Sequence, residues 1–298
     1  MNKKIRGVLA AIVTPFGPNG EVCPQRLRRQ VQRQLKHGNG VFCNGTNGEF
    51  FVLSTKEKLT VTEICMDEVA GKAPVVAHIG EISTRSTIQL GKHVAAMGVN
   101  AVSVITPYFV PLRQNELIYH YTTIADALSV PMFLYNIPAR TGNAITPETA
   151  RTLAEHPNIV GIKDSAGSYE SLKGFLDAAK DMDNFDVLSG PDHLAYQGFL
   201  EGCSACISGL ANVQPEGVSL IWKHFREGDL EKSKAAQNFI SELRNALYAV
   251  GFPPAAVKRA VVMLGEDVGE SRYPILFSEQ DLATIKTVAE KFATVPDL

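Results

Sequence analysis

A lysine at the end of a buried apolar run is the residue in this sequence best suited to covalent chemistry. Lys163 closes the run Ile159-Val160-Gly161-Ile162. Burial disfavours the charged ammonium and lowers its pKa, and the neutral amine is the form that attacks a ketone to make a Schiff base. A lone lysine at a strand end more often extends its charged head into solvent. The assignment therefore depends on which residues stand beside Lys163.

Three other segments carry groups that such chemistry needs. Tyr135 ends another apolar run and can donate and accept a proton beside an imine. The loop Gly45-Thr46-Asn47-Gly48 offers backbone N–H groups and short polar side chains that can hold a carboxylate. Arg140 follows a proline turn and can pair with a second carboxylate. Each segment alone is a weak signal, because packing tyrosines, tight turns and surface arginines are common.

The sequence gives little support for metal or redox chemistry. Cys203-Ser204-Ala205-Cys206 is a Cys-x-x-Cys pair, but a redox pair normally opens a helix and this one runs into a predicted strand. No second pair supplies zinc ligands, and no grouping of His, Asp and Glu suggests a metal-dependent aldolase. His78 ends a further apolar run, where it either lines the site or belongs to the core. We therefore expect no metal and no cofactor, only a covalent imine on Lys163.

Short apolar runs alternating with amphipathic stretches must position these residues. The runs are mostly apolar, as expected for strands buried on both faces. Eight β-α alternations predict an α/β fold of the TIM (β/α)8 barrel type. A doubly wound sheet is the alternative, but residues 12–16 after the first run lack its glycine fingerprint. The expected strands are 7–13, 40–43, 74–78, 101–105, 131–135, 159–163, 186–188 and 205–208, and the expected helices are 25–36, 55–69, 83–97, 115–128, 147–155, 170–179 and 193–201.

Beyond about residue 228 only helix-like segments remain, at 230–249, 254–264 and 279–292. We therefore expect a barrel over residues 1–228 that carries the active site, and a C-terminal helical extension over residues 229–298. In this fold the chemistry lies at the carboxyl ends of the strands. The polar motifs follow those ends, so the fold predicts that they are neighbours.

Composition limits the partners. The chain has 298 residues, a net charge of −2 and 20% charged residues, which gives no support for a nucleic-acid or anionic-membrane partner. The basic cluster Arg26, Arg28, Arg29 and Arg33 is expected to be a solvated helix face. No stretch approaches the roughly 18 apolar residues of a membrane span, and none resembles a signal peptide. An odd number of cysteines, five, favours a reducing cytoplasm.

Considered together, the motifs resemble the N-acetylneuraminate lyase and dihydrodipicolinate synthase superfamily over nearly the whole chain. The resemblance rests on residues 45–49, 135–142 and 161–164, with 11–16 and 188–192 in support. It implies a class I lyase in which Lys163 forms an imine with pyruvate or another 2-keto acid, and Tyr135, with Thr46, moves protons. It further implies that Thr46 and Asn47 hold the keto-acid carboxylate, and that the backbone of Gly190 and Ile207 lines the pocket. The family is typically a homotetramer, with a tyrosine crossing from a neighbouring subunit.

Departures from the family pattern bear on the substrate. Arg140 matches the arginine with which dihydrodipicolinate synthases hold the carboxylate of aspartate semialdehyde, whereas many sugar-acid aldolases have an apolar residue there. Phe109 stands where the synthases place the crossing tyrosine, and it lacks the hydroxyl. Asn47 replaces the usual second threonine of the loop. The positions that match the family's lysine-inhibition pocket also differ from the family pattern, which argues against feedback inhibition by lysine. These positions are Phe50, Phe51, Ile82 and Ser86.

Several functions stay open at this point. One is a condensation of pyruvate with an aldehyde, as in 4-hydroxy-tetrahydrodipicolinate synthase, which Arg140 favours. Another is retro-aldol cleavage of a 2-keto-3-deoxy sugar acid or sialic-acid-type substrate to pyruvate and an aldehyde, which Phe109 and Asn47 favour. A dehydratase or deaminase acting on a related keto acid is a third. A non-catalytic binding protein on a retired barrel is a remote alternative, since it would be expected to have lost Lys163 or Tyr135.

Overall fold

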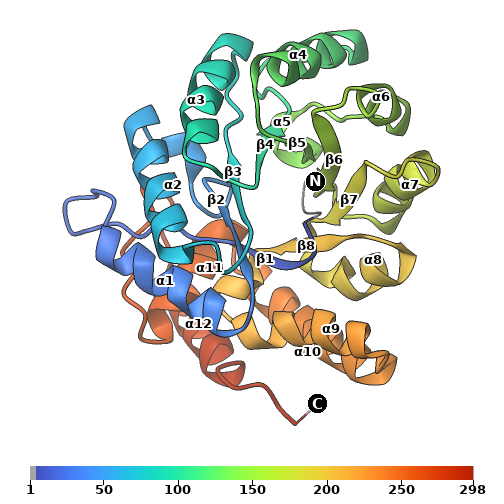
Figure 1. The fold of residues 1–298 in the computed structure, drawn as a ribbon. Helices are drawn as coiled ribbons and strands as arrows, with labels where there is room; N and C mark the ends of the chain where they lie inside the picture. Colours follow the sequence, from blue (N-terminus) through green and yellow to red (C-terminus); the bar gives the residue numbers. More distant parts are fainter. Residues whose placement is uncertain (1–4, 298) are drawn as a thin grey trace. The chain divides into compact units, whose positions relative to one another are not determined.

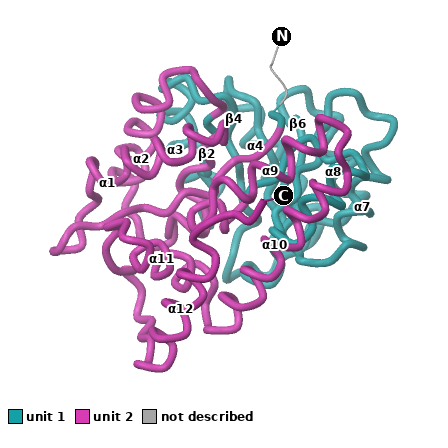
Figure 2. The backbone as a smooth tube through the Cα atoms, turned by 90° about the horizontal axis from the view of Figure 1, so that it is seen from below, with its two compact units in different colours: residues 1–6, 75–207 teal, residues 7–74, 208–298 magenta. Residues whose placement is uncertain are grey.

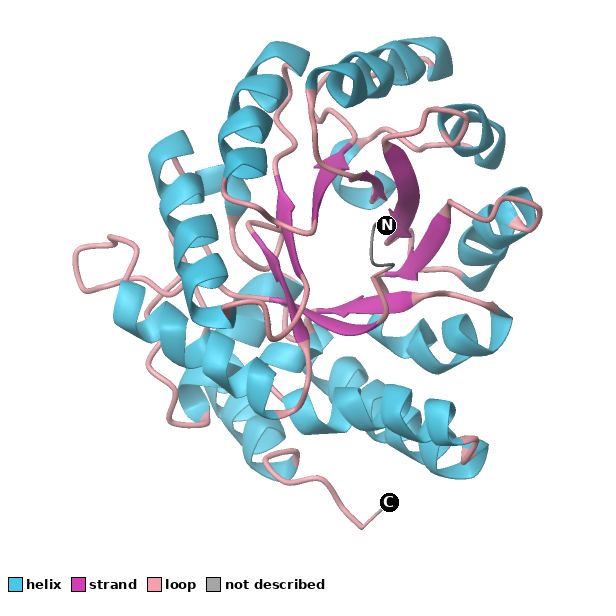
Figure 3. Cartoon of the chain, viewed as in Figure 1, coloured by secondary structure: helices cyan, strands magenta, loops and turns pink. Residues whose placement is uncertain are grey.

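The structure is a computed structural model that describes residues 5–297. Across these residues, eight strands form a closed barrel in chain order, drawn in Figure 1 and distinguished from the helices by colour in Figure 3. The predicted (β/α)8 barrel and the C-terminal helices are therefore confirmed. The strands are β1 (Gly7–Ala11), β2 (Gly40–Cys43), β3 (Val75–His78), β4 (Ala101–Ile105), β5 (Met132–Asn136), β6 (Ile159–Asp164), β7 (Asp186–Ser189) and β8 (Ala205–Ser208).

The chain divides into two compact units, which Figure 2 shows in different colours. The first unit contains residues 75–207 and the segment that ends at residue 6. Its strands β3 to β7 are all parallel, and in Figure 1 its longer helices lie outside them. The helices of this unit are α3 (Thr84–Ala96), α4 (Gln114–Ala127), α5 (Pro138–Thr141), α6 (Pro147–Leu153), α7 (Tyr169–Ala179) and α8 (Ala195–Glu201).

The second unit contains residues 7–74 and 208–298. It brings the parallel pair β1 and β2 together with the C-terminal helices of the same unit. In the described part of the chain, each helix is too short or too polar to span a bilayer. The helices of this unit are α1 (Pro24–Lys36), α2 (Thr55–Val69), α9 (Pro215–Glu227), α10 (Leu230–Tyr248), α11 (Pro253–Met263) and α12 (Glu279–Lys291).

The register between β4, β5, β6 and β7 aligns one row of residues across four strands. Ile105 pairs with Tyr135, and Tyr135 pairs with Lys163. Lys163 in turn pairs with Leu188. Successive residues of a strand point to opposite faces, and register partners point to the same face. This row therefore places the Tyr135 and Lys163 side chains next to each other on one face.

Helix α9 is an element that the sequence did not predict. Pro215 stands at its first turn and Gly217 two residues further on, so the apolar periodicity is interrupted at the start. Proline is compatible with the first turn, since the N–H it lacks has no partner inside a helix at that position. The Gln214 side chain accepts a hydrogen bond from the N–H of Gly217 at 3.3 Å and caps the helix.

The expectation that the arginine cluster of α1 forms a solvated face is wrong for Arg26 and Arg33, whose side chains are largely covered. The Arg28 side chain stays exposed and forms ion pairs at the surface. Arg28 contacts Asp67 at 2.6 Å and Glu68 at 3.1 Å on α2. Arg33 donates to the carbonyl of Asn212 at 3.0 Å, and Arg26 forms an ion pair with Asp267. Arg29 is exposed to solvent. Charge spacing along a helix did not reveal these partners because they come from distant parts of the sequence.

Gly161 on β6 lies too close to its neighbours to accept a side chain. A β-carbon there would lie 2.2 Å from the Asp186 carbonyl oxygen and 2.7 Å from the Phe133 ring. We predict that Gly161→Ala lowers the free energy of unfolding by about 1–3 kcal/mol, because the backbone must shift to relieve the overlap. Urea denaturation followed by circular dichroism measures this change.

Gly174→Ala in α7 is the matched control. Its β-carbon would meet only Pro147 Cγ, at 3.2 Å, and alanine is favoured over glycine in a helix by about 0.8–1 kcal/mol. This variant is expected to be at least as stable as the wild type. A Gly161→Ala protein with wild-type stability would contradict the close approach between β6 and β7.

Candidate active site

Lys163 and Tyr135 are brought together by the β5–β6 register. The Lys163 Nζ atom lies 3.8 Å from the centroid of the Tyr135 ring. Only 5% of Lys163 and 1% of Tyr135 is exposed. The ring face is electron-rich and attracts a nearby ammonium. The two residues that the sequence selected for imine formation and proton transfer thus form one buried contact.

His78 contacts the same tyrosine. It ends β3, is 1% exposed, and lies edge-on to Tyr135 with ring centroids 5.9 Å apart and an interplanar angle of 89°. The sequence left open whether this histidine lines the site or belongs to the core. The structure buries it directly against Tyr135, and whether it takes part in a site with Tyr135 stays a prediction.

The residues that follow Tyr135 and Lys163 on their strands hold the two strand ends together. Asn136 donates to Asp164 Oδ1 at 2.8 Å, and its own Oδ1 accepts from the N–H of Ile145 at 3.0 Å. Burial raises the pKa of Asp164, opposed by its hydrogen bond from Asn136. Both residues belong to the motifs 135–142 and 161–164, but neither of them was assigned a role from the sequence.

Gly190, Arg140 and Ile207 lie in the same unit as Lys163. The N–H of Gly190 donates to the carbonyl of Asp164 at 2.7 Å, and a β-carbon on Gly190 would lie 2.6 Å from that oxygen. The close approach explains why glycine follows β7. Arg140 is exposed on α5, and Ile207 is buried in β8. Their roles toward a substrate stay predictions.

The loop that contains Thr46 and Asn47 lies in the second unit. Asn44 and Glu49 on either side of it have left-handed φ angles of 56° and 59°. Glu49 donates its N–H to the carbonyl of Thr46 at 3.1 Å. Thr46 and Asn47 at the tip are partly exposed. The loop is a compact turn that presents both side chains, as the sequence indicated, and carboxylate binding by them stays a prediction.

Phe109 is exposed to solvent on a segment that is held by hydrogen bonds. Its side chain is 92% exposed, and its backbone has a φ of 74°. Such a conformation costs a residue other than glycine on the order of 1–3 kcal/mol. Asn143 stabilises the segment, because its amide donates to the carbonyls of Pro107 at 2.7 Å and Val110 at 2.8 Å. The fold thus holds an exposed apolar ring at this position.

The Cys-x-x-Cys pair is buried, and both of its cysteines are free. Burial raises the pKa of Cys203 to about 12, and also raises the pKa of Cys206. A thiol that stays protonated is a poor nucleophile and a poor metal ligand. Within residues 5–297, no three His, Cys, Asp or Glu side chains gather as a metal site.

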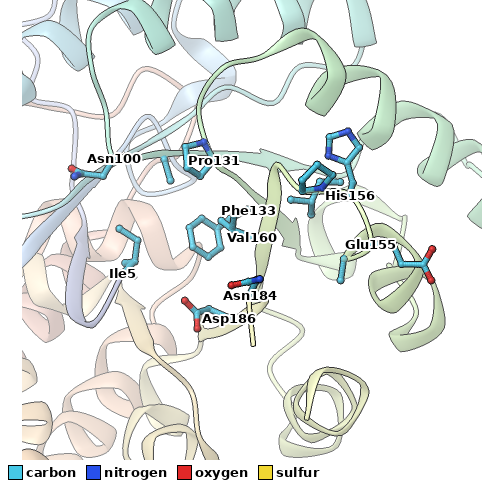
Figure 4. Close-up of a pocket in the computed structure, with 13 residues that line it drawn as sticks. Ile5, Asn100, Pro131, Phe133, Glu155, His156, Val160, Asn184 and Asp186 are labelled. Carbon is cyan, nitrogen blue, oxygen red and sulfur yellow. The ribbon is translucent and has the colours of Figure 1, made fainter. Parts of the chain in front are cut away.

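A cavity of about 490 Å³ lies at the other ends of the first unit's strands. Figure 4 shows its lining, with Asn100, Pro131 and Asp186 at or just before the starts of β4, β5 and β7. Lys163 stands near the opposite, carboxyl end of β6. In barrels of this type the chemistry lies at the carboxyl ends, so the cavity is separate from the Lys163–Tyr135 pair.

Comparison with known sequences gives consistent matches over almost the whole chain. The model of the Dihydrodipicolinate synthetase family matches residues 4–291. The 4-hydroxy-tetrahydrodipicolinate synthase of Trichlorobacter lovleyi is 35% identical over 292 residues, which cover 97% of this chain and 99% of the relative. An uncharacterized DapA-like lyase of Halobacterium salinarum is 35% identical over 278 residues, covering 93% and 90%.

Solved structures give the same result. Dihydrodipicolinate synthase from Acinetobacter baumannii, complexed with pyruvate, superposes with a TM-score of 0.93 at 32% identity and covers 98% of this chain and 100% of that one. YagE from E. coli K12, a prophage protein of the dihydrodipicolinic acid synthase family, also complexed with pyruvate, gives 0.92 at 28% identity and covers 97% and 98%.

The raised thiol pKa values predict low reactivity at the Cys-x-x-Cys pair. At pH 8 we expect Ellman's reagent to modify Cys23, which is partly exposed, well before the four buried cysteines. Because the pKa of Cys203 is raised to about 12, its thiolate fraction stays small until the pH approaches that value. Absorbance at 412 nm measures the labelling, and unfolding in guanidinium should release all five thiols. Rapid labelling of Cys203 in the native protein would contradict its buried position.

Proposed function

Because the chain belongs to the dihydrodipicolinate synthetase family of carbon–carbon lyases, we propose that Lys163 forms a Schiff base with pyruvate or another 2-keto acid. The observation that carries the proposal is the buried contact between Lys163 Nζ and the Tyr135 ring, 3.8 Å from its centroid. It is supported by two solved structures of similar proteins that are complexes with pyruvate.

The proposed reaction begins with attack of the neutral Lys163 amine on the keto carbon of pyruvate. The carbinolamine that forms loses water, and Tyr135 transfers the protons that this step requires. The resulting protonated imine withdraws electrons, so the adjacent methyl carbon gives a proton to Tyr135, the proposed base, and an enamine forms. The enamine carbon attacks the aldehyde carbon and makes the new C–C bond, the C=O π bond breaks, and the aldehyde oxygen takes a proton back from Tyr135. Water then hydrolyses the imine, which releases the product and restores Lys163.

The remaining site residues are assigned by resemblance to the family. Thr46 and Asn47 are proposed to hold the keto-acid carboxylate, and Thr46 to pass protons to Tyr135. The left-handed residues that flank their loop support this, since they make a tight turn with the two side chains at its tip. The backbone at Gly190 and Ile207 is proposed to line the pocket. No metal or organic cofactor takes part in the proposed reaction.

The proposed second substrate is an aldehyde with a carboxylate, which makes the reaction a 4-hydroxy-tetrahydrodipicolinate synthase-like condensation. Arg140 supports this choice, because its exposed guanidinium on α5 can bind a carboxylate through two hydrogen bonds. The names of several curated relatives agree with it, among them the synthases of Trichlorobacter lovleyi and Geobacter sulfurreducens.

The alternative is cleavage of a 2-keto-3-deoxy sugar acid to pyruvate and an aldehyde. It is favoured by Phe109, which cannot contribute a hydroxyl to a proton relay, and by Asn47 in the carboxylate loop. A homotetramer is the proposed assembly, and the 92% exposed ring of Phe109 supports a subunit contact there. A cytoplasmic location and a barrel boundary at residue 228 stay predictions from the sequence.

Reductive trapping tests the imine. With pyruvate and sodium borohydride, we expect peptide mass spectrometry to find a stable adduct on Lys163 in the wild type and none in Lys163→Met. Lys258 is an internal control, because it is a second buried lysine, 2% exposed, and its ammonium contacts Glu49. An adduct on Lys258 instead of Lys163, or no adduct in the wild type, would overturn the proposed chemistry.

Arg140→Ala tests the second substrate. With pyruvate and aspartate semialdehyde we expect kcat/KM to fall by roughly 10- to 100-fold, since a charge-assisted bidentate contact contributes about 1.5–3 kcal/mol. Trapping of pyruvate alone should stay at the wild-type level. Coupled assays over a panel of aldehydes and 2-keto-3-deoxy acids measure the difference. An unchanged KM for aspartate semialdehyde would remove Arg140 from the substrate site and leave cleavage as the better assignment.

A further inference from the structure

An ion pair is buried in the second unit next to the loop of Thr46 and Asn47. Lys258 on α11 donates to Glu49 Oε1 at 2.6 Å and to the backbone carbonyl of Thr14 at 2.9 Å. The two side chains are 2% and 1% exposed. The Lys258 ammonium also lies 3.9 Å from the centroid of the Phe16 ring. One cation therefore connects the segment after β1 with the residue that ends the loop.

The other oxygen of Glu49 is also occupied. Glu49 Oε2 accepts from the backbone N–H of Arg272 at 3.0 Å. The Arg272 guanidinium donates to the carbonyls of Gly20 at 2.6 Å and Val52 at 3.3 Å, and it forms an ion pair with the Glu57 carboxylate. Glu49 thus joins the loop both to α11 and to the segment that precedes α12.

Two further hydrogen bonds transmit this arrangement to the loop itself. The N–H of Glu49 donates to the carbonyl of Thr46 at 3.1 Å. The Thr14 hydroxyl donates to the carbonyl of Gly48 at 2.7 Å. Because Lys258 binds the backbone of Thr14, the same ammonium supports both contacts. The charged pair is therefore connected to the loop backbone on both sides, through Glu49 and through Thr14.

A buried ion pair is a poor source of stability by itself, since desolvation of two charges often exceeds their attraction. Burial lowers the pKa of Lys258 to about 8, and the charge of Glu49 opposes that shift. Apolar side chains of similar volume can fill such a site with equal or better stability. What the pair supplies in addition is directional hydrogen bonding, which fixes a backbone conformation.

We propose that Glu49 and Lys258 are positioning residues that hold the Thr46–Asn47 loop in the conformation that binds the carboxylate of the 2-keto acid. The inference rests on the proposed Schiff-base function and deepens it. The pair acts on substrate affinity through the loop and takes no part in the proposed attack of the Lys163 amine on the keto carbon. Loss of the pair is therefore expected to weaken binding while the imine step itself stays intact.

Glu49→Gln tests the inference through the concentration dependence of borohydride trapping. The glutamine keeps the shape of the side chain and can still accept from Arg272, but it leaves Lys258 without its counter-charge. We expect the half-saturating pyruvate concentration to rise about 10-fold or more, as for loss of a charged hydrogen bond. The trapping rate at saturating pyruvate should stay within about 3-fold of the wild type, because the variant weakens binding of the substrate and of the transition state equally.

Glu57→Gln is the matched control, since it also removes a carboxylate that faces a cation of this unit. The Arg272 guanidinium holds the pKa of Glu57 down at about 2, so this variant should lose stability that the wild type has above about pH 4.5. Its half-saturating pyruvate concentration should equal that of the wild type. Equal increases in Glu49→Gln and Glu57→Gln would attribute the effect to general destabilisation and overturn the inference.

If Glu49→Gln does not fold, Thr14→Val tests the proposed positioning role. It removes the hydrogen bond to Gly48 without changing any charge, and a several-fold rise in half-saturation is expected. An unchanged half-saturation in the folded variant overturns the inference. The two proposals fail separately: a wild type without a Lys163 adduct rejects the imine, and the positioning role with it. An adduct in the wild type with unchanged half-saturation in the variants rejects the positioning role alone.

Discussion

The register between β5 and β6 is the constraint on which the proposed chemistry depends. Tyr135 and Lys163 are partners in that register, so a slip by one residue would move one of the two to the opposite face. The register is supported on the opposite face by Asn136 and Asp164, which are also partners and share a 2.8 Å hydrogen bond. A buried polar pair on one face of the strands thus holds Tyr135 and Lys163 in register on the other.

The protein buries two lysines in different surroundings. Lys258 faces a carboxylate at 2.6 Å, which favours the ammonium form and suits a structural role. Lys163 lies over the face of Tyr135, the residue proposed to transfer protons, with its Nζ atom 3.8 Å from the ring centroid. One buried lysine therefore ties backbone segments together, and the other stands beside a group that can exchange protons.

Polar side chains and glycines together give the strand-end loops their shapes. Asn143 holds the segment that displays Phe109, and Thr14 and Glu49 hold the loop of Thr46. Gly190 lets β7 end within hydrogen-bonding distance of Asp164. These contacts allow two left-handed residues other than glycine, Glu49 and Phe109. Loops supported in this way are suited to fixing substrate groups in place before they react.

The sequence by itself determined the strands and most helices, because buried apolar runs and helix caps are local patterns. It also selected Lys163 and Tyr135, since each ends such a run. It did not reveal that Glu49 meets Lys258, or that three arginines of α1 have acidic or carbonyl partners. Glu49 and Lys258 are 209 positions apart in the sequence. Only the tertiary structure decides which distant charges share a buried site, because local sequence patterns do not predict contacts between residues far apart in the chain.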